Sequence, residues 1–321
     1  YALTAIKPQI LFQAQGSGQP NLNKQIIDNL QLSIPYLSEQ RKIARILTTL
    51  DSLIEQTECL IAKYQAVKQG MMHDLFTRGV DAHGKLRPPQ SEAPGLYKQS
   101  ELGWIPNEWE MGRLGDYLSS IDAGWSPNCI EQPPALGEWG VLKVSSVTSG
   151  VYRDEESKTL PSHLHPDYSL EVRPGDVLLA RSNGVAELVG VAVQVQQTQG
   201  RLMLSDKVLR LNPDKSQMTP SFLGLTMRVD GTRRQIGQVL NGSSGQRNIS
   251  QAEIRNLVIS APALEEQHLI TARLHAAQTQ VQHEKCAVSK LQQMKSGLMQ
   301  DLLTGKVRVQ VDDLEEATVR A

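Results

Sequence analysis

Two long stretches of the chain carry apolar residues at alternating steps of four and three, a spacing that lines them along one helix face. The first stretch covers residues 36–76 and the second covers residues 262–303. In the first, a second apolar row at Ile46, Leu53, Leu60 and Val67 recurs every seven residues. Such a seam with a wide apolar flank is typical of a helix that packs against another helix. We therefore predict two long helices.

Helix-end signals agree with these limits. Ser38 is a plausible N-cap for the first helix, and Glu39 lies in the first turn, where a carboxylate interacts favourably with the helix dipole. Gly79 follows the first helix and Gly305 follows the second. Glycine commonly ends helices because it adopts the left-handed conformation without strain.

The simplest way for two half-buried helices to cover their apolar seams is to form an antiparallel coiled coil. If they cross near their midpoints, Lys68 lies near Glu284 and Thr57 lies near Lys295, which would pair the polar groups that interrupt the seams. The predicted interface comprises Ile43, Leu47, Leu50, Ile54, Ile61, Tyr64, Lys68, Ile270, Leu274, Val281, Glu284, Val288 and Leu291.

Between the helices the pattern changes to short β-branched segments bounded by Gly, Pro or Asp, which predict strands at 141–147, 177–180, 189–195 and 208–211. Ser250-x-x-Glu253 is a capping box for a short helix that reaches Leu257. Residues 78–103 contain several prolines and glycines, so we expect a linker without regular structure. We predict an α+β fold for residues 104–261, with a curved, mostly antiparallel or mixed sheet.

The sequence from Gly18 to Val80 returns as Gly245 to Val307, at a constant shift of 227 residues (245 − 18). Residues 1–34 therefore correspond to residues 228–261, the end of the middle domain. We expect a fuller version of the chain to carry about one more domain, roughly 130 residues, ahead of Tyr1. The expected organisation is a domain tail at 1–35, a first helix at 36–78, a linker at 79–103, a complete domain at 104–261, a second helix at 262–305 and a tail at 306–321.

Charge is unevenly distributed in this 321-residue chain, although its formal net charge is only −1. Residues 101–180 contain 5 Lys and Arg against 13 Asp and Glu, whereas residues 181–262 contain 10 against 5. A net charge near zero argues against a strongly basic nucleic-acid binder, but a basic segment still favours contact with an acidic partner.

Cysteine usage and hydropathy bear on location. None of the 3 cysteines belongs to a Cys-x-x-Cys pair, which fits a reducing, cytoplasmic compartment. Cys59 and Cys286 are equivalent positions of the repeat, and we interpret them as small packed apolar groups. No apolar run approaches the roughly 20 residues that span a bilayer, so no membrane partner is expected.

A search for catalytic motifs in the sequence finds none that is complete. Asn212-Pro213-Asp214 departs at its third position from the Asn/Asp-Pro-Pro-aromatic motif of adenine methyltransferases. Gly305-Lys306 lacks the earlier glycine of a phosphate-binding loop, and His163-x-His165 has no third metal ligand nearby. We therefore predict no catalytic residue, cofactor or metal on this chain.

Three motifs resemble those of type I restriction-modification specificity subunits. They are Leu37-x-Glu39-Gln40 at the start of the first helix, Met71-Met72-x-Asp74-Leu75 near its end, and Gly103-Trp104-Ile105-Pro106-x-Glu108-Trp109 at the start of the next domain. The second helix closes with a similar run from Leu298 to Val307. In that family two target-recognition domains alternate with two long helices, so the resemblance covers nearly the whole chain.

The resemblance implies a non-catalytic subunit that recognises a half-site of a bipartite double-stranded DNA target, with the helices as spacers. It also implies methyltransferase subunits that use S-adenosylmethionine and restriction subunits that use ATP and Mg²⁺, all of them partners of this chain. With most of one recognition domain absent, a homodimer through the helices is a further hypothesis. The alternatives are a coiled-coil assembly scaffold without sequence-specific DNA binding and an enzyme with an unrecognised site.

Candidate DNA-binding residues lie in the basic half of the middle domain. Arg and Asn are the side chains that bond bidentately to guanine and adenine, whereas isolated Lys and Arg more often contact phosphates. The candidates are Arg181, Ser182, Asn183, Lys207, Arg210, Arg233, Arg234, Ser243, Ser244, Gln246 and Arg247. The repeated Gly-Gln-x-Asn, at 18–21 and 245–248, is either a structural turn that leads into the short helix or a DNA contact.

Overall fold

The structure of this chain is a computed structural model, which describes residues 1, 7–13, 24–28, 30, 34–242 and 245–310. The chain divides into two units, one formed by residues 1–67 and 277–321 and the other by residues 68–276. The two long helices, α4 (Leu37–Thr77) and α9 (Leu264–Leu303), contribute residues to both units. Their limits lie within two residues of the predicted ones, because the heptad pattern repeats over many turns.

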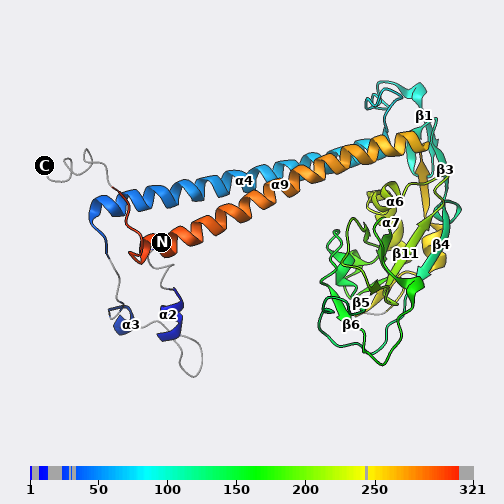
Figure 1. The fold of residues 1–321 in the computed structure, drawn as a ribbon. Coiled ribbons are helices and arrows are strands. Elements are labelled where there is room, and N and C mark those ends of the chain that lie inside the picture. The colour runs from blue at the N-terminus through cyan, green and yellow to red at the C-terminus, as the bar shows by residue number, and fades with distance from the viewer. Residues whose placement is uncertain (2–6, 14–23, 29, 31–33, 243–244, 311–321) are drawn as a thin grey trace. The chain divides into compact units, whose positions relative to one another are not determined.

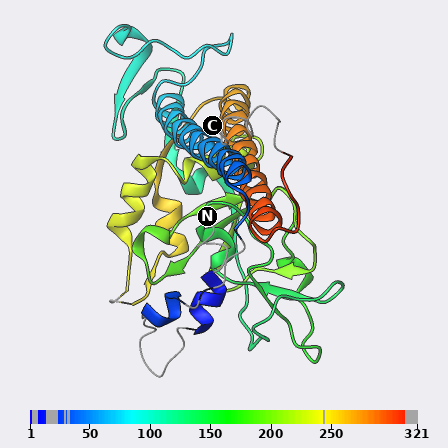
Figure 2. The same cartoon turned by 90° about the vertical axis from the view of Figure 1, so that its left-hand side faces the viewer.

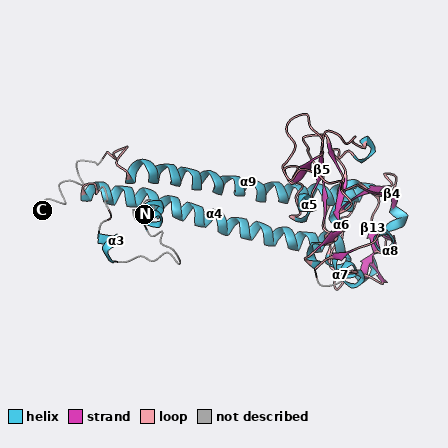
Figure 3. Ribbon diagram, turned by 90° about the horizontal axis from the view of Figure 1, so that it is seen from below, coloured by secondary structure: helices cyan, strands magenta, loops and turns pink. Residues whose placement is uncertain are grey.

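The first unit contains α2 (Lys7–Gln13), α3 (Lys24–Asp28), the first part of α4 and the last part of α9. Within it, Ile43, Leu47 and Leu302 form an apolar cluster, flanked by Leu298 and Met299. Early residues of α4 thus pack on late residues of α9, and the two segments run side by side in Figures 1, 2 and 3. The predicted antiparallel pairing is confirmed in this unit.

The predicted register of that pair needs correction. Lys295 forms an ion pair with Asp51, and the Thr57 hydroxyl donates to the Leu53 carbonyl of its own helix at 2.7 Å. The expected Thr57–Lys295 proximity is therefore wrong. Burial of Ile43 and Leu47 decides the register here, because burying a large apolar side chain stabilises by about 1.5–3 kcal/mol, more than one exposed polar pair. Lys68 and Glu284 belong to different units, so their pairing stays a prediction.

The helical seams show the predicted burial. Every residue of the predicted interface is buried or half-buried, whereas Leu53 and Val67 of the second apolar row are 42% and 51% exposed. Cys59 and Cys286 are exposed, so their interpretation as packed apolar groups is wrong. Both lie on the solvent-facing side of their helices, outside the seam.

The two largest sheets described in the second unit have four and three strands. Strands β4 (Leu118–Ala123), β11 (Val208–Pro213), β7 (Val177–Ala180) and β9 (Ala192–Gln194) form an antiparallel sheet in that order. Strands β10 (Leu202–Met203), β5 (Gly140–Leu142) and β6 (Ser157–Thr159) form a mixed sheet, parallel between β10 and β5. The α+β prediction is confirmed. The strand predicted at 141–147 ends early, because its second half forms helix α5 (Ser145–Thr148).

Helix α6 (Pro220–Thr226) packs on strands β7, β9 and β11 of the antiparallel sheet. Helices α7 (Asp230–Val239) and α8 (Gln251–Asn256) follow, and α8 packs on the 3₁₀ turn at Leu114–Tyr117. Short 3₁₀ turns lie at Pro94–Leu96, Leu114–Tyr117, Tyr168–Leu170 and Ala186–Leu188. The predicted capping box is confirmed, since Ser250 Oγ accepts from the Glu253 amide at 3.1 Å and Glu253 accepts from the Ser250 amide at 2.6 Å. In the core, Phe76 of α4 stacks on Phe222 of α6 with ring centroids 5.0 Å apart.

The linker prediction for residues 78–103 is wrong in part. Strands β1 (Tyr97–Ser100) and β2 (Gly103–Pro106) form an antiparallel hairpin, and Val80 bridges to Leu86. Tyr97 and Ile105 are buried, which supplies the apolar contacts that a free linker lacks. Strand β3 (Glu110–Arg113) then pairs with β13 (Val258–Ala261), which precedes α9.

The described helices follow the sequence repeat. Shifting α3 by 227 gives residues 251–255, inside α8, and shifting α4 gives 264–304, which matches α9. Shifting α2 gives 234–240, which overlaps α7. The duplication therefore extends from sequence to secondary structure.

Candidate nucleic-acid interface

Two of the predicted DNA-reading segments, far apart in the sequence, are adjacent strands in the second unit. Strand β8 (Ser182–Asn183) pairs antiparallel with β12 (Arg247–Asn248), so that Asn183 lies opposite Arg247. The Ile249 amide donates to the Arg181 carbonyl at 3.0 Å and extends this pairing. We call residues 181–184 and 245–248 the β8–β12 ribbon.

Lys207 is joined to the ribbon through the backbone, since the Arg181 amide donates to the Lys207 carbonyl at 2.9 Å. Lys207, Gln246 and Arg247 are exposed, and Arg181 is half-buried. Within the described chain, the side chains of Arg181, Lys207 and Arg247 take part in no ion pair, although each carries a positive charge. Their donors are therefore available to an acidic ligand.

The local geometry of the ribbon is fixed by its small polar residues. Asn183 Oδ1 accepts from the Val185 amide at 2.9 Å, an Asx turn that orders the end of β8 and leaves the amide nitrogen of Asn183 to donate. A Cβ added at Gly184 would lie 3.2 Å from the Gly245 carbonyl oxygen, so the two loops approach closely. Ser182 is buried and contributes backbone pairing rather than an exposed hydroxyl.

Arg210 has a different environment from the one predicted for a DNA contact. Only 12% of its side chain is exposed, and Nη2 lies 2.8 Å from Asp122 while Nη1 lies 3.3 Å from Asp176. Nη1 and Nη2 also donate to the carbonyls of Glu171 and Ser169. These contacts use the guanidinium inside the sheet and favour a structural role for Arg210 over DNA contact.

The remaining candidates for DNA contact lie in different environments. Arg233 is half-buried and its Nη2 donates to the Glu187 carbonyl at 2.7 Å, so it supports the turn before β9. Burial lowers the pKa of Arg233. Arg234 is exposed on α7, with a weak 3.4 Å contact to the Asp230 carbonyl. Ser243 and Ser244 lie outside the described residues.

The second copy of Gly-Gln-x-Asn combines a turn with a strand. Gly245 has a φ of 127°, which favours glycine, and Asn248 bonds through its backbone to Asn241 at 3.0 and 2.9 Å. The motif then leads into the capping box of α8. This arrangement favours the structural interpretation for Gly245 and Asn248, while Gln246 stays exposed. The first copy, at 18–21, lies outside the described residues.

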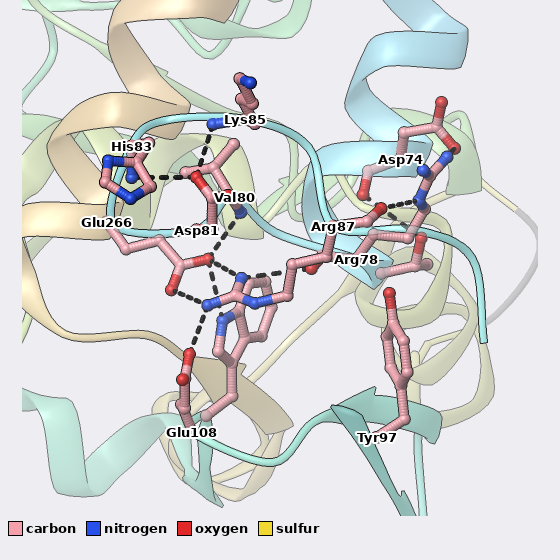
Figure 4. A network of polar contacts seen from close by, with 12 residues as sticks. Asp74, Arg78, Val80, Asp81, His83, Lys85, Arg87, Tyr97, Glu108 and Glu266 are labelled. Atoms are coloured by element: carbon pink, nitrogen blue, oxygen red, sulfur yellow. Dashed lines mark hydrogen bonds and ion pairs between the residues drawn. The ribbon is translucent and has the colours of Figure 1, made fainter. Parts of the chain in front are cut away.

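A polar network at the start of α9 was not predicted from the sequence. Arg87 is 8% exposed, and its guanidinium lies 2.5 Å from both Glu266 of α9 and Glu108 (Figure 4). Glu266 also accepts from the Val80 amide at 2.8 Å and from the Trp109 indole at 3.1 Å. A Cβ at Gly79, whose φ is 62°, would lie 2.2 Å from Glu266, so only glycine fits there. The repeat of Glu39 as Glu266 was the available signal for this network.

The fold is an α+β domain joined to two long helices, and the sequence comparisons identify its family. The chain matches the type I restriction modification DNA specificity domain over residues 1–63 and 166–291, and it belongs to that family. The hypothesis of a scaffold unrelated to DNA recognition finds no support in this match. Among the described residues, no helix is both long and apolar enough to cross a membrane.

Named relatives come from bacteria and archaea. The chain is 28% identical to the MjaVIII specificity subunit of Methanocaldococcus jannaschii over 319 residues, which cover 96% of this chain and 69% of that protein. It is 36% identical to the EcoEI specificity subunit of Escherichia coli over 181 residues, 56% of this chain and 30% of that protein. The chain thus matches less than a third of the EcoEI subunit.

Solved structures agree on the fold. A type I restriction-modification system S subunit from M. genitalium superposes with a TM-score of 0.57 at 14% identity, over 94% of this chain and 71% of that one. A chain from a type I restriction-modification complex studied for its assembly and conformational transition gives 0.53 at 17% identity, over 96% and 69%. At such identities the similarity concerns the fold alone.

Proposed function

We propose that this chain is a non-catalytic specificity subunit that recognises one half-site of a bipartite double-stranded DNA target. Family membership supports DNA sequence recognition, and the β8–β12 ribbon supplies a surface for it. The observation that carries the proposal is the placement of Asn183 opposite Arg247, with Lys207 bonded through its backbone to Arg181. Arg181, Lys207 and Arg247 take part in no ion pair among the described residues.

The chemistry of the ribbon fits base reading flanked by phosphate contacts. Arg247 can bond bidentately to guanine and the Asn183 amide can donate to a base, since these residue types recognise base edges in the major groove. Lys207 and Arg181 are better suited to phosphates, which receive half or more of protein–DNA hydrogen bonds. The turn at Asn183 holds this residue in place before DNA binds, which reduces the entropy lost on binding.

Partners supply the chemistry in this proposal. Relatives of this chain are named as specificity subunits of type I restriction enzymes, which supports assembly with methyltransferase and restriction subunits. We place this assembly in the cytoplasm. S-adenosylmethionine, ATP and Mg²⁺ would bind to those partners rather than to this chain. The long helices would set the distance between half-sites, either in a longer chain or in a homodimer formed through them.

Selection from a random duplex pool tests DNA recognition. The purified chain is expected to enrich one short half-site, and Asn183→Ala or Arg247→Ala is expected to relax the preference at one base position each. Arg153→Ala serves as the matched control, because Arg153 is exposed in the acidic half of the domain. An enriched sequence that is identical for all four proteins, or no enrichment at all, would contradict the proposal.

A further inference from the structure

One edge of the four-stranded sheet brings together three segments that are far apart in the sequence. Strands β4 and β7 end at this edge and β11 begins there, because β11 pairs antiparallel with both of them. Residues 124–126 follow β4, residues 204–207 precede β11, and residues 181–184 of the β8–β12 ribbon follow β7. The first of these segments contains Trp125, which therefore lies at the same edge of the sheet as the ribbon.

The backbone around Trp125 is bonded to the segment that precedes β11. The Trp125 amide donates to the Leu204 carbonyl at 3.2 Å, and the Asp206 amide donates to Ser126 Oγ at 3.2 Å. The Ser126 hydroxyl in turn donates to the Asp206 carboxylate. A Cβ added at Gly124 would lie 2.1 Å from the Leu204 carbonyl oxygen, so the two backbones are in direct contact. Trp125 is therefore held on the domain on both sides of its position in the chain.

The sheet register relates Trp125 to the cations beside the ribbon. Ala123 of β4 lies opposite Leu209 of β11, and two further residues along each segment lead to Trp125 and Lys207. The Lys207 carbonyl accepts from the Arg181 amide at 2.9 Å, which continues the same edge to the ribbon. Neither Lys207 nor Arg181 takes part in an ion pair within the described part of the chain. The tryptophan thus adds an aromatic side chain to a basic edge.

The Trp125 side chain offers both an apolar surface and a hydrogen-bond donor. It is 41% exposed, and its indole N–H donates to no other residue that the structure describes. A single exposed tryptophan is ordinary on a protein surface, so exposure alone indicates no function. A neutral donor at a basic edge, however, matches the sugar–phosphate backbone of DNA. Phosphate oxygens accept hydrogen bonds from protein donors, and an aromatic ring combines apolar contact with a polar N–H.

We propose that Trp125 is a further DNA contact, which donates its indole N–H to a phosphate oxygen and packs its ring on the adjoining deoxyribose. Lys207 and Arg181 bind neighbouring phosphates. Because the contact concerns the DNA backbone alone, it adds affinity and fixes the position of the domain on the duplex without selecting bases. The inference rests on the proposed function, since it requires DNA to lie along the β8–β12 ribbon.

Replacement of Trp125 tests the contribution to affinity. Trp125→Phe loses the N–H and keeps a ring, so it is expected to weaken binding of the selected duplex about five-fold, and Trp125→Ala about 20-fold. A scrambled duplex should lose the same factors. The slope of log K against log salt concentration should stay that of the parent chain, because a neutral indole releases no counterion. Trp104→Ala is the matched control that should bind as the parent does, since Trp104 of β2 is 47% exposed.

Fluorine NMR of the intact chain detects the contact without relying on a substituted protein. With 5-fluorotryptophan at all 4 tryptophans, the Trp125 signal is assigned by its loss in Trp125→Phe. Adding the selected duplex is expected to shift this signal and to leave that of Trp104 in place. An unmoved Trp125 signal in a chain that enriches a half-site would overturn this inference and leave the proposed function standing, as would an altered preference at one base position in Trp125→Ala. A parent chain that enriches no half-site would overturn both.

Discussion

At the scale of single residues, Arg87 shows how a buried charge is held in this protein. Its guanidinium is 8% exposed and lies between Glu266 and Glu108, and the Glu266 side chain is only 13% exposed. Burial lowers the pKa of Arg87, but the hydrogen bond and charge of Glu266 outweigh this and raise it. Each charge of the pair therefore depends on the other to offset its loss of hydration.

Removing one partner should leave the other buried without compensation. We expect Arg87→Ala to reduce the free energy of unfolding of the second unit by about 3–5 kcal/mol, as found for broken buried ion pairs. Urea denaturation followed by the fluorescence of the 4 tryptophans, all of which lie in the second unit, measures it. Lys85→Ala, an exposed side chain of the same segment, should stay within about 0.5 kcal/mol of the parent. A similar small effect for Arg87→Ala would show that the network is not structural.

The ion pair between Asp122 and Arg210 makes the stability of the fold depend on pH. Burial raises the pKa of Asp122, but hydrogen bonds from Asn212 and Arg210 outweigh it and leave the pKa below its ordinary value. A carboxyl whose pKa is lower in the folded state stabilises the fold above its unfolded pKa of about 3.9, and that contribution is lost as pH falls through the folded pKa.

Asp122→Asn should therefore destabilise the protein at pH 7, and this loss should shrink as pH falls below about 3.9 toward the folded pKa of Asp122. Urea denaturation of both proteins at pH 7, 5 and 3 measures the difference. Asp206→Asn, at an exposed position near the ribbon, provides a comparison. A difference between Asp122→Asn and parent that is constant over this range would contradict the assignment of the ion pair.

At the scale of elements, the paired helices depend on a narrow apolar seam. Leu47 is fully buried against Leu302 and its neighbours, whereas Leu53 on the flank is 42% exposed. Leu47→Ala should destabilise the helix pair by about 2–5 kcal/mol, the usual cost of truncating a buried leucine, and Leu53→Ala should have little effect. Helical circular dichroism during thermal unfolding measures both. Equal losses would mean that the seam does not hold the pair together.

The long helices could be predicted because the same apolar spacing repeats through many turns. This repetition identifies the segment as a helix and also identifies the face that it buries. Shorter elements lack that redundancy. Val147 belongs to a β-branched run that predicts a strand, yet it lies in α5, where its burial is decided by the surrounding sheet. Similarly, the prolines of residues 78–103 indicated a linker, yet Tyr97 and Ile105 are buried and belong to the two strands of a hairpin.

At the scale of the whole molecule, the sequence indicated which residues could contact DNA, but it did not indicate which of them share one surface. The segments at 181–184 and 245–248 were both singled out, but nothing in their sequence shows that they pair as strands. In the sequence, Arg210 and Lys207 both appeared as available cations beside a strand. The carboxylates that pair with Arg210, Asp122 and Asp176, come from distant positions in the chain. Among the described residues, ion pairs between distant positions decide which cations are available to a ligand. This distinguishes the cations of the β8–β12 ribbon from Arg210.

Local rather than net charge should govern DNA binding, because the chain as a whole carries a formal charge of only −1. Each phosphate that a protein neutralises contributes about −0.9 to the slope of log K against log salt concentration. If Lys207 contacts a phosphate, Lys207→Ala should weaken binding to every sequence alike and reduce the magnitude of the slope by about 0.9.

Titrations of the selected duplex at several salt concentrations measure this slope, with Arg153→Ala as the control that should match the parent. Arg247→Ala tests the complementary role. If Arg247 reads a base, its replacement should narrow the affinity difference between the selected duplex and one altered at a single position. A slope left unchanged by Lys207→Ala would exclude it from the phosphate contacts, and the positive side of the interface would then have to lie elsewhere on the domain.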